Sequence, residues 1–195
     1  MKKLRFYYDV VCPYSYMESR AIEAAEDSGQ VEVEWLPFEL RPAPSALLEP
    51  RGDHLRVDWT RTVYRRALAV GLEIHLPRHQ PRSTLPLAAC LWAGGQRRLR
   101  NFKHALYEAF FCEGEDIATD EQIARAAGRS GLDPAAAVAA AYSAELLARI
   151  REIRGEAEAA GVRGVPSLLT DDGETHWGMG GLERLLEGRP LVPRA

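Results

Sequence analysis

The first forty residues alternate between two hydrophobic periods, and this alternation constrains the fold more than any other part of the chain. Residues 3–11 alternate and are rich in aromatic and β-branched side chains, which is typical of a strand. Pro13 follows at a position that a helix tolerates in its first turn, and apolar residues then recur at helical spacing until Gly29. Residues 31–36 alternate again. The pattern predicts a β-α-β unit, after which the chain leaves the second strand through Pro37 and a proline-rich loop.

The middle of the chain is predicted to be helical. Apolar residues at helical spacing indicate one helix around residues 63–70, which Gly71 closes. A second helix covers residues 85–92, with Ser83 or Thr84 as its N-cap.

Three more helices are expected after these two. Residues 102–110 carry a helical apolar stripe. Thr119 begins a capping box that opens another helix, which ends near Gly131. Asp133 and Pro134 have the residue types of an N-cap and a first helical position, so they predict the start of one long alanine-rich helix.

The period changes again near the C-terminus. Residues 167–170 and 174–177 have strand character, and the Asp-Gly turn signal between them, at residues 171–173, predicts a β-hairpin. Leucines at positions 182, 185 and 186 indicate a short closing helix. The predicted order is therefore β-α-β, a helical block, then β-β-α, which is an α/β fold without internal repeats.

Composition and charge exclude several classes of protein. The 195 residues suffice for one substantial core or one domain with a large insertion, and 46% apolar and 27% charged residues are ordinary for a globular protein. A net charge of −3 argues against a nucleic-acid binder. No apolar run is long enough to span a bilayer, and residues 1–4 lead into the first strand without the apolar stretch of a secretory signal. We expect a cytoplasmic protein with neither a nucleic-acid nor a membrane partner.

Three cysteines, an odd number with wide spacing, make a disulfide framework improbable. No Cys/His pair has the spacing of zinc ligands, so no metal site is predicted. Cys90 and Cys112 lie among apolar neighbours and are predicted to be core residues, although a role in resolving a disulfide stays open for either. Cys12 is different because of its position.

Cys12 lies where the first strand meets the first helix, in the segment Asp9-Val-Val-Cys-Pro-Tyr-Ser-Tyr16. A sulfur at a helix N-terminus is surrounded by free backbone N–H groups and by the positive end of the helix dipole, which lower a thiol pKa. Ser15 can add a hydroxyl hydrogen bond, but its position holds no second cysteine. The alternative is that Cys12 is a small packing residue at a tight turn.

A second segment with a chemical implication is Gly161-Val-Arg-Gly-Val-Pro-Ser167, between the long helix and the third strand. Proline is acceptable at the first residue of a strand, and a cis bond before Pro166 would expose the Val165 backbone to a neighbour. The alternative is an ordinary loop proline.

Together the two segments resemble the DsbA-like branch of the thioredoxin superfamily, in which a Cys-Pro-x-x tetrapeptide opens the first helix and faces a cis-proline loop. The resemblance continues along nearly the whole chain. Residues 33–42 are similar to the second-strand segment of FrnE-like proteins and 2-hydroxychromene-2-carboxylate isomerases. Residues 107–117 resemble the helical insertion of those proteins, and residues 161–166 match their cis-proline loop.

This resemblance implies a thioredoxin fold with a large all-helical insertion. The implied domains are a thioredoxin-like domain, formed by residues 1–58 and 161–195, and an insertion domain formed by residues 59–160.

The resemblance also implies roles for four residues. Cys12 would be the nucleophile and Ser15 would tune it. Val165 and Pro166 would bind the substrate backbone. Pro13 and Tyr14 complete the expected substrate-binding set, with Tyr14 shaping the groove.

The departures from the family pattern leave three functions open. FrnE-like oxidoreductases usually have Cys-Pro-Trp-Cys, whereas isomerases and kappa-class glutathione transferases usually have Ser-Pro-Tyr-Ser; this chain has the hybrid Cys-Pro-Tyr-Ser. We expect a thiol-disulfide oxidoreductase that acts on a disulfide-containing protein or a low-molecular-weight thiol. The alternatives are a glutathione-dependent isomerase or transferase of small aromatic molecules and a binding or chaperone module.

Binding partners are constrained less than the fold. The resemblance implies an aspartate near the C-terminus that pairs with the glutathione amino group, and Gly180 stands at its place. No resident cofactor is expected; glutathione as a cosubstrate and a homodimer both stay open.

Overall fold

The structure, a computed structural model, describes residues 2–50 and 52–187 and is built around one sheet. Its strands are β1 (Lys2–Tyr8), β2 (Val31–Pro37), β3 (Ser167–Thr170) and β4 (Thr175–Trp177), in the spatial order β2-β1-β3-β4. β1 runs parallel to β2 and antiparallel to β3, which pairs antiparallel with β4. The predicted β-α-β unit and the predicted hairpin are both confirmed.

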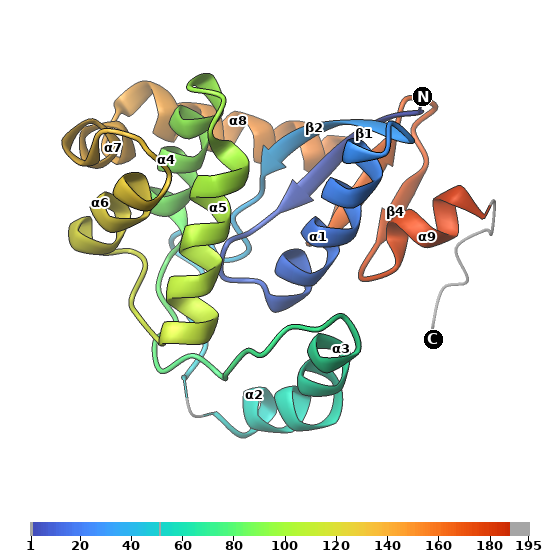
Figure 1. Ribbon diagram of the computed structural model, residues 1–195, viewed down its shortest axis with the longest axis horizontal. Coiled ribbons are helices and arrows are strands. Elements are labelled where there is room, and N and C mark those ends of the chain that lie inside the picture. The colour runs from blue at the N-terminus through green and yellow to red at the C-terminus, as the bar shows by residue number, and fades with distance from the viewer. Residues whose placement is uncertain (1, 51, 188–195) are drawn as a thin grey trace.

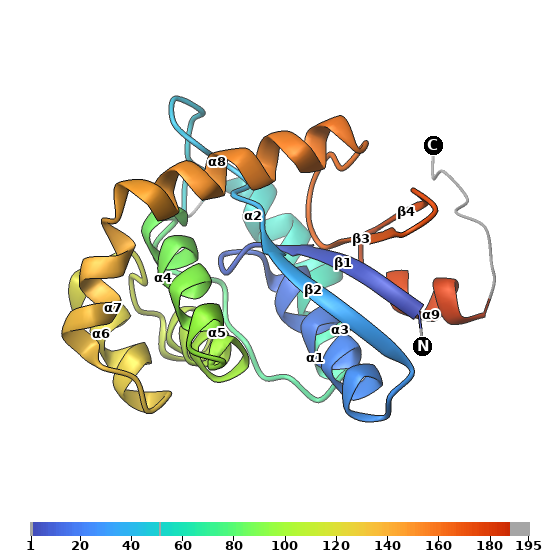
Figure 2. The ribbon, with the colours of Figure 1, turned by 90° about the horizontal axis from the view of Figure 1, so that it is seen from above.

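Helices cover both faces of this sheet. α1 (Pro13–Asp27) and α9 (Gly181–Leu186) lie against one face, and α8 (Ala144–Ala159) lies along the other, as Figure 2 shows. β1 supplies both faces because its side chains alternate. Phe6 and Tyr8 pack into the apolar cluster that includes Met17 of α1, while Tyr7 packs with Ile153 of α8. The sheet is therefore buried on both sides, which holds the β1–α1 junction in place.

The remaining helices lie between β2 and β3 in the chain and form the predicted helical block. They are α2 (Asp53–Asp58), η1 (Trp59–Val63), α3 (Tyr64–Ala69), α4 (Thr84–Gly95), α5 (Leu99–Glu108), η2 (Ala109–Glu113), α6 (Asp120–Arg129) and α7 (Pro134–Ala141), where η1 and η2 are turns of π-helix. Figure 1 shows α4 to α7 beside the sheet and α2 and α3 apart from them, below α1. Within the described ranges, no helix has both the length and the apolar character that crossing a bilayer requires.

We call residues 53–70 the arm. Its α2, η1 and α3 follow one another without a break. Leu55, Trp59, Val63 and Ala67 recur at every fourth residue and are buried, so one side of the arm faces the core. The predicted domain boundary, between residues 58 and 59, falls inside this run of turns. Helix α8, which the prediction assigned to the insertion domain, packs on the sheet. The division into two domains stays a prediction.

Three predicted element boundaries are wrong. The helix predicted around residues 63–70 is only the last part of a helical run that begins at Asp53. The helix predicted from Asp133 is not continuous, because the chain turns at Tyr142 and Ser143 begins α8 as a new N-cap, with its Oγ accepting from the Leu146 N–H at 3.4 Å. The first strand ends at Tyr8, not at residue 11. Residues 9–11 form a turn and do not continue the strand, because the Asp9 carboxylate accepts the Val11 N–H at 3.3 Å.

A buried ion pair joins the helical block to α1. Lys103 Nζ of α5 lies 2.7 Å from Glu23 Oε1, and Glu23 Oε2 lies 2.7 Å from His104 Nε2. The Lys103 ammonium also lies 3.4 Å from the ring centroid of Trp35 in β2. These contacts fix α5 against both α1 and the sheet.

Candidate functional site

Cys12 is the N-cap residue of α1, as the sequence predicted. Its N–H donates to the Asp9 carbonyl at 3.1 Å, which closes the turn after β1, and its carbonyl accepts the Tyr16 N–H at 3.1 Å. Pro13 follows at the first helical position. The Cys12 side chain makes no cap hydrogen bond in this turn, but the Ser15 hydroxyl and the backbone N–H groups of Ser15 and Tyr14 are near enough to lower the pKa of the thiol. The first turn of the helix thus surrounds the sulfur with donors, which is the arrangement inferred from the motif.

The loop before β3 lies against this sulfur. The Val165–Pro166 peptide bond is cis, as the family resemblance implied. The Cys12 thiol donates to the Val165 carbonyl oxygen, and the two atoms are 3.7 Å apart although the residues are 153 positions apart in sequence. Gly164 permits this path, since a Cβ there would lie 3.2 Å from Nε1 of Trp177. The fold therefore brings together the residues predicted as nucleophile and as substrate-binding loop.

The pKa of Cys12 differs from the expectation. Its pKa is raised to about 11, chiefly by burial and to a lesser extent by the buried charge of Asp9, while the donors of Ser15 and Tyr14 act in the opposite direction. Only 5% of Cys12 is exposed, so removing the thiolate from water outweighs the donors at the helix terminus. The sequence showed the donors but not the covering by the Val165 loop. At neutral pH the thiol form predominates in this conformation.

Asp9 is a buried acid that the sequence analysis assigned no role. Its Oδ2 accepts the Leu40 N–H at 2.8 Å and the Ser83 hydroxyl at 3.0 Å. Burial raises its pKa to about 6. Ser83, one of the two residues predicted as N-cap of this helix, is the N-cap of α4. Its hydroxyl donates to Asp9 and makes no hydrogen bond to the helix backbone. An acidic residue three positions before the cysteine, at the end of a buried strand, was the available signal.

Tyr14 connects the motif to the arm. Its hydroxyl donates to Asp58 Oδ2 at 3.4 Å, and the Arg66 guanidinium lies 5.9 Å from the centroid of its ring. Tyr14 is half-buried and packs in the same apolar cluster as Cys12 and Val165. The arm therefore borders the mouth of the site, a contact that sequence spacing did not show. Tyr16, in contrast, is buried and stacks on the ring of Tyr107 in α5.

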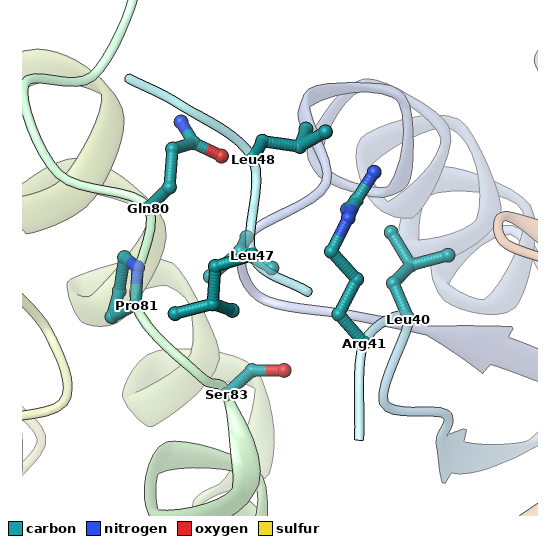
Figure 3. A pocket seen from close by; sticks show the side chains of 8 residues that line it. Leu40, Arg41, Leu47, Leu48, Gln80, Pro81 and Ser83 are labelled. Carbon is teal, nitrogen blue, oxygen red and sulfur yellow. The ribbon is translucent and has the colours of Figure 1, made fainter. Parts of the chain in front are cut away.

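A narrow pocket adjoins the β1–α1 junction. The residues that line it are Val11, Leu40, Arg41, Leu47, Leu48, Gln80, Pro81 and Ser83. Figure 3 shows Leu47 in the middle, Gln80 and Pro81 on one side of it, and Arg41 and Leu40 on the other. The space inside is about 10 Å³, which suffices for about one water molecule. This pocket is too small for an aromatic substrate.

The two other cysteines occupy different environments. Cys90 is completely buried in α4, as predicted, but Cys112 is exposed in η2, so its predicted place in the core is wrong. The turn of η2 points Phe110 and Phe111 inward and leaves Cys112 outside, with its thiol donating to the Glu73 carbonyl at 3.4 Å. No group of three His, Cys, Asp or Glu side chains suited to a metal ion occurs in the described part of the chain.

This difference gives a first prediction. In the native protein at pH 7.5, iodoacetamide should leave Cys90 unmodified, and it should react there only after unfolding, because the thiol lies inside the core. Peptide mass mapping before and after addition of urea measures this. Labelling of native Cys90 at the rate of Cys112 would contradict its buried position. The Cys112→Ser protein is then a sufficient background for following Cys12.

Comparison with known proteins agrees with the geometry. The family described as DSBA-like thioredoxin domain matches residues 3–188. The chain belongs to this family. The uncharacterized protein YwbO of Bacillus subtilis is 33% identical over 135 residues, which are 68% of this chain and 68% of that protein. The expected thioredoxin fold with a helical insertion is thereby confirmed.

Several solved structures superpose well on the chain. A 2-hydroxychromene-2-carboxylate isomerase gives a TM-score of 0.80 at 21% identity, over 95% of this chain and 93% of that one. The probable DsbA oxidoreductase SCO1869 of Streptomyces coelicolor gives 0.76 at 20% identity, over 100% and 94%. The cytosolic disulfide reductase DsbM of Pseudomonas aeruginosa, solved with GSH, gives 0.71 at 20% identity, over 94% and 92%. At these identities the structures establish the fold alone.

Proposed function

We propose that this DsbA-like protein is a thiol-disulfide oxidoreductase that uses Cys12 as its single nucleophile. The observation that carries the proposal is the position of the Cys12 sulfur, at the first turn of α1 and 3.7 Å from the Val165 carbonyl of the cis-proline loop. The Ser15 hydroxyl and the N–H groups of Ser15 and Tyr14 favour its thiolate, since each lowers the pKa of the thiol. A polypeptide backbone bound along Val165 and Pro166 would bring a disulfide to this sulfur.

The reaction needs an external thiol. The Cys12 thiol loses its proton to solvent, and the thiolate attacks one sulfur of R–S–S–R′, so that the S–S bond breaks and R′–S⁻ leaves and takes up a proton. The product is a mixed disulfide, Cys12–S–S–R. A second thiolate, R″–S⁻, then attacks the R sulfur, forms R–S–S–R″ and releases Cys12. A second R″ thiolate then attacks R–S–S–R″ and releases R–S⁻ with R″–S–S–R″, so two R″ thiols supply the two electrons of a complete reduction.

The environment of Cys12 favours disulfide reduction over oxidation. Strong dithiol oxidants stabilise their reduced, thiolate form. In this chain burial raises the pKa of Cys12 to about 11, so the reduced form gains no such stabilisation, and Ser15 supplies no second sulfur for an internal disulfide. The solved relative DsbM is described as a cytosolic disulfide reductase and contains GSH. We therefore propose a cytoplasmic reductase for which a low-molecular-weight thiol, glutathione among the candidates, resolves the mixed disulfide.

Two observations favour this function over the glutathione-dependent isomerase. Gly180 has φ +73° and no side chain to pair with an amino group, and a Cβ there would meet Arg184 at 3.3 Å. The neighbouring amides are also occupied, since Glu18 accepts the Gly180 N–H at 2.8 Å and the Leu182 N–H at 3.0 Å. A ligand carboxylate would have to displace this buried side chain.

The direct test is to trap the mixed disulfide. Cys112→Ser protein is mixed with 2,2′-dipyridyl disulfide, a neutral reagent that releases coloured pyridine-2-thione when a thiolate attacks it. We expect one equivalent of thione and one thiopyridyl adduct on Cys12, which glutathione then removes. An adduct located on Cys90, or no adduct at all, would exclude the proposed mechanism.

A further inference from the structure

The arm has an exposed face on which apolar and basic side chains alternate. Of the eight large hydrophobic side chains exposed in the described part of the chain, four lie on the arm, and Leu68 is 79% exposed. The four are Val57, Tyr64, Leu68 and Val70. Arg61 lies four residues after Val57 and three before Tyr64, and Arg65 lies three before Leu68, spacings that place these side chains on the same side of a helix, while Val70 follows at the C-cap. This side is opposite the buried one.

The charge of this face is unbalanced. The arm contains four arginines and two aspartates, although the whole chain has a net charge of −3. Asp53 lies 3.8 Å from Arg56, and Asp58 accepts the Tyr14 hydroxyl. Within residues 2–50 and 52–187, no carboxylate forms an ion pair with the remaining arginines of the arm, which are Arg61, Arg65 and Arg66. The arm is therefore a basic region of an acidic protein.

The arm also borders the reacting sulfur. The Arg66 guanidinium lies over the ring of Tyr14, and Tyr14 packs with Cys12 and Val165. In Figure 1 the arm lies below α1, whose N-cap residue is Cys12. The arm thus contacts the cysteine motif through Arg66 and Asp58, so a molecule bound along the arm would lie beside the mouth of the site.

We infer that the arm is the docking surface for a polypeptide substrate in which the disulfide cysteine is flanked by acidic and apolar residues. Acidic side chains of the substrate would be attracted to the unpaired arginines of the arm, and its apolar side chains would cover the exposed leucine and valines. The length of the face favours a polypeptide, because the turns between Val57 and Leu68 extend about 17 Å, the span of about five extended residues. This inference rests on the proposed function and names the substrate class of the same site.

Electrostatic attraction of this kind acts mainly on association. Exposed charges contribute little to the stability of a complex, but they raise the rate of encounter with a partner of opposite charge, and salt removes the effect. We therefore expect acidic substrates to react faster than basic ones at low ionic strength.

The test uses two activated peptides of identical sequence, except that acidic residues flank the cysteine in one and lysines in the other. In each, the cysteine is linked to 2-thiopyridine, so attack by Cys12 transfers the peptide and releases pyridine-2-thione. In the Cys112→Ser background at low salt, the acidic peptide should react at least about tenfold faster than the basic one. The preference should fall to about twofold or less in 0.5 M NaCl, where the Debye length is only a few ångströms.

Matched variants locate the effect. The double variant Arg61→Glu, Arg65→Glu should remove the preference for the acidic peptide, whereas Arg125→Glu, which reverses one exposed charge on α6, should retain it. Arg61 and Arg65 are exposed, so their replacement leaves the buried side of the arm intact; an unchanged circular dichroism spectrum checks this.

Three outcomes would overturn the inference, and they are distinguishable from failure of the proposed function. Equal rates for the two peptides, or a preference that the arm variant retains, would exclude the arm as docking surface while leaving Cys12 as nucleophile. Thiopyridyl glutathione that reacts as fast as the acidic peptide, with the same dependence on Arg61 and Arg65, would identify a small anionic disulfide as the occupant. If no disulfide reacts with Cys12, including neutral 2,2′-dipyridyl disulfide, the proposed function itself fails.

Discussion

The Cys12→Ser protein is expected to form no mixed disulfide, and its first step of disulfide exchange should slow by at least about a thousandfold. A serine hydroxyl can neither ionise at this pH nor form an S–S bond. Serine is a good N-cap residue and is close to cysteine in size, so the β1–α1 turn and α1 should be retained. The release of pyridine-2-thione from 2,2′-dipyridyl disulfide, followed in a single turnover, measures the loss.

The control for this experiment is the exposed thiol. Cys112→Ser should keep the first step within about twofold of the parent protein, because Cys112 lies in η2 and takes no part in the attack. A Cys12→Ser protein that still reacts within tenfold of the parent rate would contradict the assignment of the nucleophile. In that case the family fold would remain, and its function would have to reside elsewhere in the chain.

Local signals in the sequence predicted much of the fold. The Asp-Gly pair between two alternating segments predicted the hairpin. Thr119 was predicted as an N-cap, and its Oγ1 does accept the Gln122 N–H at 3.3 Å. Pro13 marked the start of α1. Each of these features depends on neighbours within a few residues, so the sequence contains the relevant information. The cis bond before Pro166 came from the family resemblance and not from a local rule.

What the sequence did not show depends on contacts across the fold. The Cys12 sulfur is covered by Val165, and the partners of Asp9 come from Leu40 and Ser83, 31 and 74 positions away. Neither burial nor its effect on a pKa can be inferred from spacing along the chain. The break at Tyr142 was missed because the alanine-rich segment has no glycine or proline to mark it.

The raised pKa of Cys12 predicts an unusual pH dependence. With a pKa of about 11, against 9.0 for an ordinary thiol, the thiolate fraction at pH 7.5 is about a hundredfold lower. Native Cys12 should therefore react with iodoacetamide about a hundredfold more slowly than the same residue in unfolded protein. The rate should continue to rise above pH 9, and not level off there. A plateau near pH 7 would show instead that the donors of Ser15 and Tyr14 outweigh burial.

Asp9→Asn isolates the electrostatic part of this effect. The buried carboxylate raises the pKa of Cys12, and the pKa of Asp9 itself is raised to about 6, so its charge opposes the thiolate above that pH. Removing the charge should speed alkylation of Cys12 at pH 7.5, by about threefold or more. It should also remove a shoulder near pH 6 from the rate profile of the parent protein. Glu121→Gln, which removes an exposed charge on α6, should change neither feature.

The same ionisation should affect stability, with a defined sign. Because the pKa of Asp9 is higher in the folded protein than its ordinary value of 3.8, the folded state binds more protons between pH 4 and about 6. The contribution of Asp9 to the free energy of unfolding is therefore fully present below pH 4 and declines as the pH rises through 6. Urea unfolding of the parent and Asp9→Asn proteins across this range measures the difference. The opposite result would be a free energy of unfolding that rises from pH 4 to 6 in the parent relative to the Asp9→Asn protein. It would mean that the hydrogen bonds from Leu40 and Ser83 stabilise the carboxylate more than burial destabilises it, and that Asp9 is ionised throughout this range.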